Sequence, residues 1–213
     1  PGRAVPDLKS VCHVLTIGGG RTGAHFVSAT GDNRPMGRRI VLLRAVNVGG
    51  AKLPMADLRE IAGALGATEV STFIASGNLI CTVPGEPAAF DRALEKAVEE
   101  RFGYFREVIS RTPEELAAAL AAYPFERDAE QARPKFSYLH VLVAAPTPAA
   151  AAAFNQIDFG ADRAAVSGDI AYLHYGEGAG TSKRTPAVLV RRLGVQGTAR
   201  NLNTIAKLIE LAS

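Results

Sequence analysis

The sequence predicts an α+β protein made of two ferredoxin-like modules of the βαββα type, with antiparallel sheets and helices packed on them. Two observations point to this fold class. Apolar patterns in the order βαββαβ run from residue 39 to 109, and the same order restarts near residue 135. The turns also agree, because Ser76-Gly77-Asn78 matches Ser167-Gly168-Asp169 at the same place in each series. We therefore interpret the chain as an internal duplication.

The first module is expected over residues 37–111. It begins with an apolar strand over 40–46, a loop over 47–52 and a helix over 54–65 whose apolar residues recur at i, i+3, i+4 and i+7. Strands over 69–75 and 79–83 are separated by Gly77-Asn78, which favours a two-residue hairpin with positive φ. A helix over 87–102 and a strand over 104–109 complete the module.

The second module is expected over residues 112–213. A linker helix over 113–122 starts with the capping box Thr112-Pro113-Glu114-Glu115. A strand over 135–144, a helix near 148–155, two strands around Gly168 and a helix near 186–192 repeat the earlier series, and a docking helix over about 205–209 ends the chain.

Residues 1–36 show neither the strand period nor the helix period, so we expect a non-core N-terminal extension, a candidate for a disordered tail. Gly18, Gly20 and Gly23 match GxGxxG, but the helix and βαβ context of a dinucleotide site is missing. Met36, directly before the first strong strand, is a candidate natural start.

Composition narrows the function classes. The chain has 213 residues, two cysteines outside any CxxC pair and no apolar run of membrane-spanning length. These features predict a soluble, cytoplasmic protein with no membrane partner, no metal and no cofactor. Positive charge gathers in two segments, 37–53 with four basic residues and no acid, and 180–213 with six basic residues against Glu210.

Four blocks in order carry a family resemblance: Arg44 to Gly50, Pro54 to Arg59, Ser76-Gly77-Asn78 and Thr198 to Thr204. Together they resemble the bacterial domain-of-unknown-function family DUF1697 over about residues 38–212. The resemblance implies a two-part α+β fold without an established activity, substrate or cofactor. The sequence departs from the family pattern at two places. Ala45-Val46 stands where glycine-isoleucine is more usual, and Leu202 stands where an aromatic residue is more usual, so the chain lacks a possible stacking ring at Leu202.

Two polar groups form the candidate site. In a βαββαβ module the loop 47–52 and the turn 76–78 should meet at one sheet edge, with exposed backbone N–H groups and positive charge suited to an anion. The second group precedes the last helix, whose N-terminus favours a phosphate or carboxylate. We also expect Asn201 or Asn203 to cap that helix. The candidate ligand-binding residues are Arg44, Asn47, Gly49, Gly50, Lys52, Ser76, Asn78, Ser182, Lys183, Arg200, Asn201 and Asn203.

The resulting hypothesis is a small phosphate- or carboxylate-bearing ligand held in a cleft between the two modules, with Arg200 as its main contact. Turn and cap chemistry alone is the competing interpretation of the same residues. An RNA-binding protein of RRM-like topology and a ligand-free interaction or structural module are the alternatives. His140 and His174 lie in strand patterns, and no known catalytic motif occurs, so the sequence assigns no reaction and no catalytic residue.

Overall fold

Each half of the chain forms a four-stranded antiparallel sheet with helices, as the sequence predicts. The computed structural model describes residues 37–213 except 48, 49, 51, 126–135, 181, 183 and 184. The expected N-terminal extension therefore lies outside the described residues. The first module contains β1 (Gly37–Leu43), α1 (Met55–Ala64), β2 (Thr68–Thr72), β3 (Asn78–Val83), α2 (Pro87–Phe102) and β4 (Val108–Arg111).

The second half repeats this order after a connecting helix. It contains α3 (Pro113–Ala121), β5 (Ser137–Leu142), α4 (Pro148–Asn155), β6 (Arg163–Ser167), β7 (Ile170–His174), α5 (Pro186–Leu193), β8 (Gly197–Asn201) and α6 (Leu202–Ala212). The strand orders are β2-β3-β1-β4 and β6-β7-β5-β8, so the two sheets have the same topology. The predicted duplication is thus visible as two ferredoxin-like modules.

The structure contains one strand that the sequence does not predict. The sequence pattern places residues 198–201 in the approach to the last helix, but Thr198, Ala199 and Arg200 belong to β8, which pairs antiparallel with β5. Gly, Thr, Ala, Arg and Asn form no apolar alternation, so local pattern gives little sign of a strand here. The duplication itself was the available signal, because β4 follows α2 at the equivalent place in the first module.

The first hairpin is longer than predicted. Thr72 pairs with Leu79 and the Phe73 N–H donates to the Asn78 carbonyl, so residues 74–77 form the turn and Asn78 already belongs to β3. The two-residue Gly77-Asn78 hairpin is therefore wrong, although Gly77 does have positive φ, at +74°. In the second module Ser167 pairs with Ile170, which leaves a two-residue turn.

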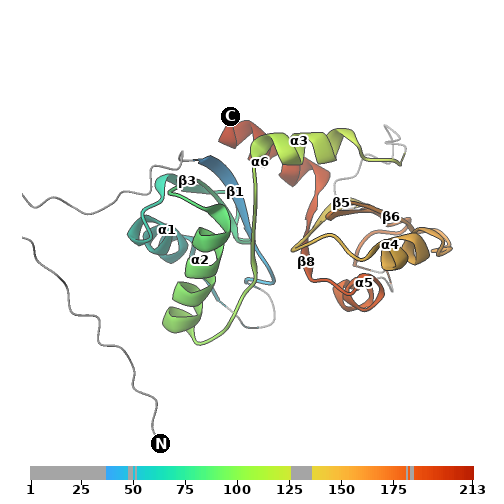
Figure 1. The fold of residues 1–213 in the computed structure, drawn as a ribbon, viewed down its shortest axis with the longest axis horizontal. Helices are drawn as coiled ribbons and strands as arrows, with labels where there is room; N and C mark the ends of the chain where they lie inside the picture. The colour runs from blue at the N-terminus through green and yellow to red at the C-terminus, as the bar shows by residue number, and fades with distance from the viewer. Residues whose placement is uncertain (1–36, 48–49, 51, 126–135, 181, 183–184) are drawn as a thin grey trace, which may run out of the picture. The chain divides into compact units, whose positions relative to one another are not determined.

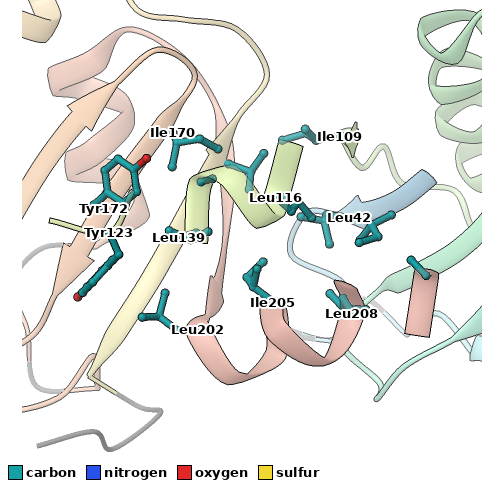
Figure 2. Close-up of a cluster of buried hydrophobic side chains, with 14 of the residues drawn as sticks. Leu42, Ile109, Leu116, Tyr123, Leu139, Ile170, Tyr172, Leu202, Ile205 and Leu208 are labelled. Atoms are coloured by element: carbon teal, nitrogen blue, oxygen red, sulfur yellow. The ribbon is translucent and has the colours of Figure 1, made fainter. Parts of the chain in front are cut away.

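Both faces of each sheet are covered. On the first sheet, Val41, Leu43, Leu79 and Cys81 belong to one cluster with residues of α1 and α2. Figure 1 shows both helices beside this sheet. The outer face of the second sheet packs against residues of α4 and α5 such as Phe154 and Leu189. The inner faces of both sheets contribute to one further cluster with α3 and α6, which contains Leu42, Leu116, Leu139 and Ile205 (Figure 2).

This inner cluster makes α6 a shared element rather than an attachment to one module. α6 contacts β1 and β3 of the first sheet and β5 and β8 of the second, and it also packs on α3. Its buried residues Leu202, Ile205 and Leu208 have the helical spacing that the sequence predicts for a docked helix.

We keep residues 37–111 and 112–213 as the proposed boundaries of the two modules. No helix in the described part of the chain has the length and apolar character needed to cross a bilayer.

His140 is a buried polar side chain on the outer face of the second sheet. It is 1% exposed, and neither ring nitrogen has a hydrogen-bond partner among the described residues. Burial, together with the positive charges of Arg44 and Arg200, lowers the pKa of His140 to about 4. The imidazole is therefore neutral in the folded protein at neutral pH, which agrees with a structural rather than a catalytic histidine.

Gly77 allows a direct test of the first hairpin. A Cβ at Gly77 would lie 2.4 Å from Val46 Cγ2, whereas a Cβ at Gly168, which also has positive φ, would meet nothing within 4 Å. Gly77→Ala should therefore lower the free energy of unfolding by about 2–4 kcal/mol, and Gly168→Ala by about 1 kcal/mol, the cost of backbone strain alone. Urea unfolding of both variants measures these two losses of stability. Equal losses would show that close packing at Gly77 does not add to the cost of backbone strain.

His140 predicts a pH dependence of stability. The unfolded state takes up a proton near pH 6.5, whereas the folded state resists it until about pH 4. Stability contributed by the neutral imidazole is thus complete above about pH 6.5 and is lost as the pH falls towards 4, by about 3 kcal/mol. Replacing His140 by Leu should remove this loss. Urea unfolding of both proteins at about pH 7.5 and 4.5 tests it, and parallel pH profiles would contradict it.

Candidate functional site

The predicted site residues divide into a buried junction between the modules and a separate surface cavity. Arg200 belongs to the junction. The register of β8 against β5 sets Arg200 opposite Leu139, so its side chain shares the inner face with Leu139 and the first module lies in front of it. Arg200 is 8% exposed.

All five N–H groups of Arg200 are donated to protein acceptors. Its Nε donates to Asn78 Oδ1 at 2.6 Å, and one terminal nitrogen donates to the Leu43 and Ser76 carbonyls at 2.9 and 2.8 Å. The other terminal nitrogen donates to Thr198 Oγ1 and to the Ala199 carbonyl. A guanidinium has five N–H donors, so none remains for a ligand.

The charge of Arg200 is held by neutral acceptors. Burial lowers the pKa of Arg200 to about 10, so the side chain stays protonated at neutral pH. Carbonyl and amide oxygens replace the water that the guanidinium loses on folding. The prediction that Arg200 is the main ligand contact therefore does not agree with this geometry, because the side chain forms a structural link between the modules.

Arg111 makes the same kind of link in the opposite direction. It lies on β4, opposite Ile40, and reaches the second module, where one terminal nitrogen donates to the Leu142 carbonyl and to Asp169 Oδ2 at 2.7 and 2.5 Å. Leu142 ends β5 just as Leu43 ends β1, and Asp169 occupies in Ser-Gly-Asp the place of Asn78 in Ser-Gly-Asn. We call these two reciprocal links, centred on Arg200 and Arg111, the arginine clasps.

Asn47 and Asn78 hold the loops of the first module together. The Asn47 side chain donates to the Leu53 and Ala75 carbonyls and accepts from the Leu53 N–H, which closes the loop 47–53 and ties it to the hairpin turn. The predicted meeting of the two loops is therefore confirmed. Asn78, fully buried, donates to the Phe73 carbonyl and to Ser76 Oγ and accepts from Arg200.

The other predicted residues are distributed over the molecule. Arg44 forms an ion pair with Glu107 at 3.0 Å, and Ser182 donates to Asp162, which also accepts from the Gly176 N–H. Asn201 is the N-cap of α6 and accepts from the Thr204 N–H at 2.8 Å, so the predicted cap is confirmed, whereas Asn203 is exposed. Gly49 and Lys183 lie outside the described residues.

Lys52, Gly50 and Asn47 remain together at a cavity. This cavity has a volume of about 520 Å³ and is lined by Asn47, Gly50, Lys52, Leu53, Pro54, Met55 and Ala75. We call it the α1 cavity, because it lies at the N-terminal end of α1. Its walls are mainly carbon, and Lys52 supplies the charged group. The expected loop residues thus do line a hollow, but the described lining belongs to the first module alone.

These findings define the class of protein: an α+β chain of two ferredoxin-like modules that share one core and exchange arginine clasps. The model of the family described as "Protein of unknown function (DUF1697)" matches residues 36–172, well over half of the chain. The chain therefore belongs to that family, as the resemblance implied. The block from Thr198 to Thr204 lies beyond the matched range.

The fold is shared with a solved structure. It is described as "the structure of conserved bacterial protein SP0830 from Streptococcus pneumoniae", and it aligns with a TM-score of 0.65 at 22% identity, covering 84% of this chain and 100% of that one. At this identity the likeness concerns the fold. A search among curated proteins finds no match.

Arg200 predicts a large stability effect. Arg200→Met should leave the Asn78, Leu43 and Ser76 acceptors unpaired in the core and lower the free energy of unfolding by at least about 3 kcal/mol. Arg111→Met should cost about 1–2 kcal/mol, because Asp169 is half exposed. Arg192→Ala, at an exposed position on α5, should change little. Urea unfolding measures the free energy of unfolding of the three variants. An Arg200→Met variant as stable as the unmodified protein would contradict the structural role of Arg200.

Proposed function

We propose that this protein binds a small phosphate- or carboxylate-bearing ligand in the α1 cavity. The observation that carries the proposal is Lys52, which lines the cavity and whose side chain forms no ion pair or hydrogen bond with any described residue. Its backbone carbonyl accepts from the Tyr104 hydroxyl at 2.7 Å, so the residue itself is anchored. A fixed backbone with an unengaged ammonium group favours an anion at this place.

The start of α1 adds to the same preference. Its N-cap is Pro54, which makes no side-chain cap, so the first N–H groups of the helix have no capping acceptor from it. Asp57 in the first turn would repel an anion, but its carboxylate is engaged by Arg101 at 2.7 Å. Leu53, Pro54, Met55 and Ala75 provide an apolar wall, which suits an anion with an attached apolar group.

Backbone strain is concentrated in the loops around the cavity. Four of the described residues other than glycine have positive φ. Ala45 and Asn47 lie in the turn that follows β1, and Ile74 lies in the first hairpin turn. An exposed, β-branched residue such as Ile74 rarely adopts this conformation without a compensating constraint. Strain of this kind gathers at ligand sites, which supports the α1 cavity over other hollows as the binding site.

The alternatives receive less support. RNA binding of the RRM type uses an open sheet face with exposed aromatic residues, but both faces of each sheet are covered here and Tyr172 is buried in the inner cluster. A ligand-free interaction module would tolerate changes at the α1 cavity without loss of any binding.

We also propose that the protein is cytoplasmic. Cys81 is a buried free thiol, and burial raises its pKa to about 12. Such a thiol suits a reducing compartment.

Phenyl phosphate tests the proposed function, because it combines a dianion with an apolar ring. We expect calorimetric titration to give a Kd below about 1 mM, at least 10-fold tighter than inorganic phosphate, which lacks the ring. Lys52→Ala should weaken binding about 10-fold, and Lys96→Ala, on the exposed face of α2, should leave it unchanged. Binding that is absent, or unaffected by Lys52→Ala, would overturn the proposal.

A further inference from the structure

The two arginine clasps differ in their surroundings. The Arg200 clasp is sealed, since Arg200 and Asn78 are both buried. The Arg111 clasp opens on a cavity of about 530 Å³, which we call the clasp cavity, and the Asp169 side chain is 44% exposed. The cavity lies between the modules, because Arg39 and Asp91 line it from the first and Val143 and Asp169 from the second. Duplicated contacts have thus produced one closed junction and one open hollow.

Arg39 is a side chain in this cavity whose guanidinium donors form no hydrogen bond to any described residue. Its side chain is 20% exposed. Its contact with Glu115 is an ion pair at 3.8 Å, too long for a hydrogen bond. Arg111 by contrast donates to Ser110, Leu142 and Asp169. A largely buried guanidinium without an acceptor is costly, and a ligand oxyanion would satisfy it.

The neighbouring acids do not supply that acceptor. Asp91 Oδ2 accepts from the Ser110 N–H and hydroxyl at 3.1 and 2.8 Å, and its Oδ1 is buried without a partner. Glu115 Oε2 accepts from the Thr112 N–H in the capping box of α3. These carboxylates are committed to backbone and hydroxyl groups of the fold. They nevertheless leave negative potential in the cavity, to which Asp169 adds.

This mixture of charges selects a ligand class. A simple anion would be attracted by Arg39 and Arg111 but repelled by the four acidic residues of the lining, which are Glu86, Asp91, Glu115 and Asp169. A simple cation would be repelled by the two arginines. A molecule with one group of each sign can match both. We propose that the clasp cavity binds a free amino acid or a zwitterion of similar size, with its carboxylate on Arg39 and its ammonium group towards Asp169 and Glu115.

The site differs from the α1 cavity in place and in chemistry. The two cavities have no lining residue in common, and the α1 cavity offers a lysine and an apolar wall where the clasp cavity offers arginines and carboxylates. The zwitterion site therefore goes beyond the proposed function. An experiment that contradicts ligand binding at one cavity leaves the proposal for the other cavity unaffected. Because its lining comes from both modules, a ligand there would also bridge them and raise their joint stability.

The experiment uses the full chain and the twenty free L-amino acids. Melting shifts at about 10 mM select the strongest ligand, and calorimetric titration then compares it with its deaminated acid and its decarboxylated amine. We expect a Kd between about 10 μM and 1 mM for the amino acid, with each partial ligand at least 10-fold weaker. No melting shift with any amino acid, or equal binding of the deaminated acid, would overturn the proposal.

Substitutions locate the binding. Arg39→Gln should weaken the selected amino acid at least 10-fold, whereas Arg38→Gln, the neighbouring arginine paired with Glu69, and Lys52→Ala should leave its Kd unchanged. Should Arg39→Gln fail to fold, amide chemical shifts of the unmodified protein give a second measurement. The Ser110 and Ala88 amides should move on titration; shifts confined to other regions would overturn the assignment.

Discussion

The Arg200 guanidinium is the contact on which the joining of the two modules depends. It brings a positive charge from β8 into the core and distributes it over carbonyl and amide oxygens, among them those of Leu43, Ser76 and Asn78 in the first module. Such a group is stable inside the protein only while every donor is satisfied, so the end of β1 and the first hairpin turn must keep their positions. The turn geometry and Asn78 thereby become part of the junction.

The arginine clasps also explain why two ferredoxin-like modules behave as one structure. Arg111 on β4 donates to the carbonyl at the end of β5, and Arg200 on β8 donates to the carbonyl at the end of β1. Helices α3 and α6 complete the apolar cluster between the two sheets. The hydrophobic cluster supplies most of the favourable free energy, and the polar clasps fix the relative position of the sheets, because hydrogen bonds are directional where apolar contacts are not.

Covering both faces of each sheet moves any binding to loops and module edges. The open sheet face that RNA-binding proteins of RRM topology use is absent from the described residues, since the inner faces of the two sheets meet across the core. Among the described residues, two cavities of similar size and different chemistry lie at such places, the α1 cavity with Lys52 and the clasp cavity with Arg39. Their separation would let the protein respond to two ligands, one beside a strained loop and one across the junction.

Sequence alone determined the fold class, the duplication, the helices over 87–102 and 148–155 and a cap of the last helix by Asn201 or Asn203, of which the structure selects Asn201, because helix periodicity, turn residues and caps are local properties. It also indicated that the loops at Asn47 and Ser76 meet. Tertiary structure decided the role of Arg200. A basic residue before a helix resembles an anion contact in sequence, but pairing of β8 with β5 turns the Arg200 side chain inward. Three of its five donors go to acceptors more than 120 positions away in the sequence, and the other two go to Thr198 and Ala199. The role of Arg39 likewise depends on tertiary structure, because only the packing of α2, α3 and the second module around it places its guanidinium in a cavity, 3.8 Å from Glu115 and without a hydrogen bond to any described residue.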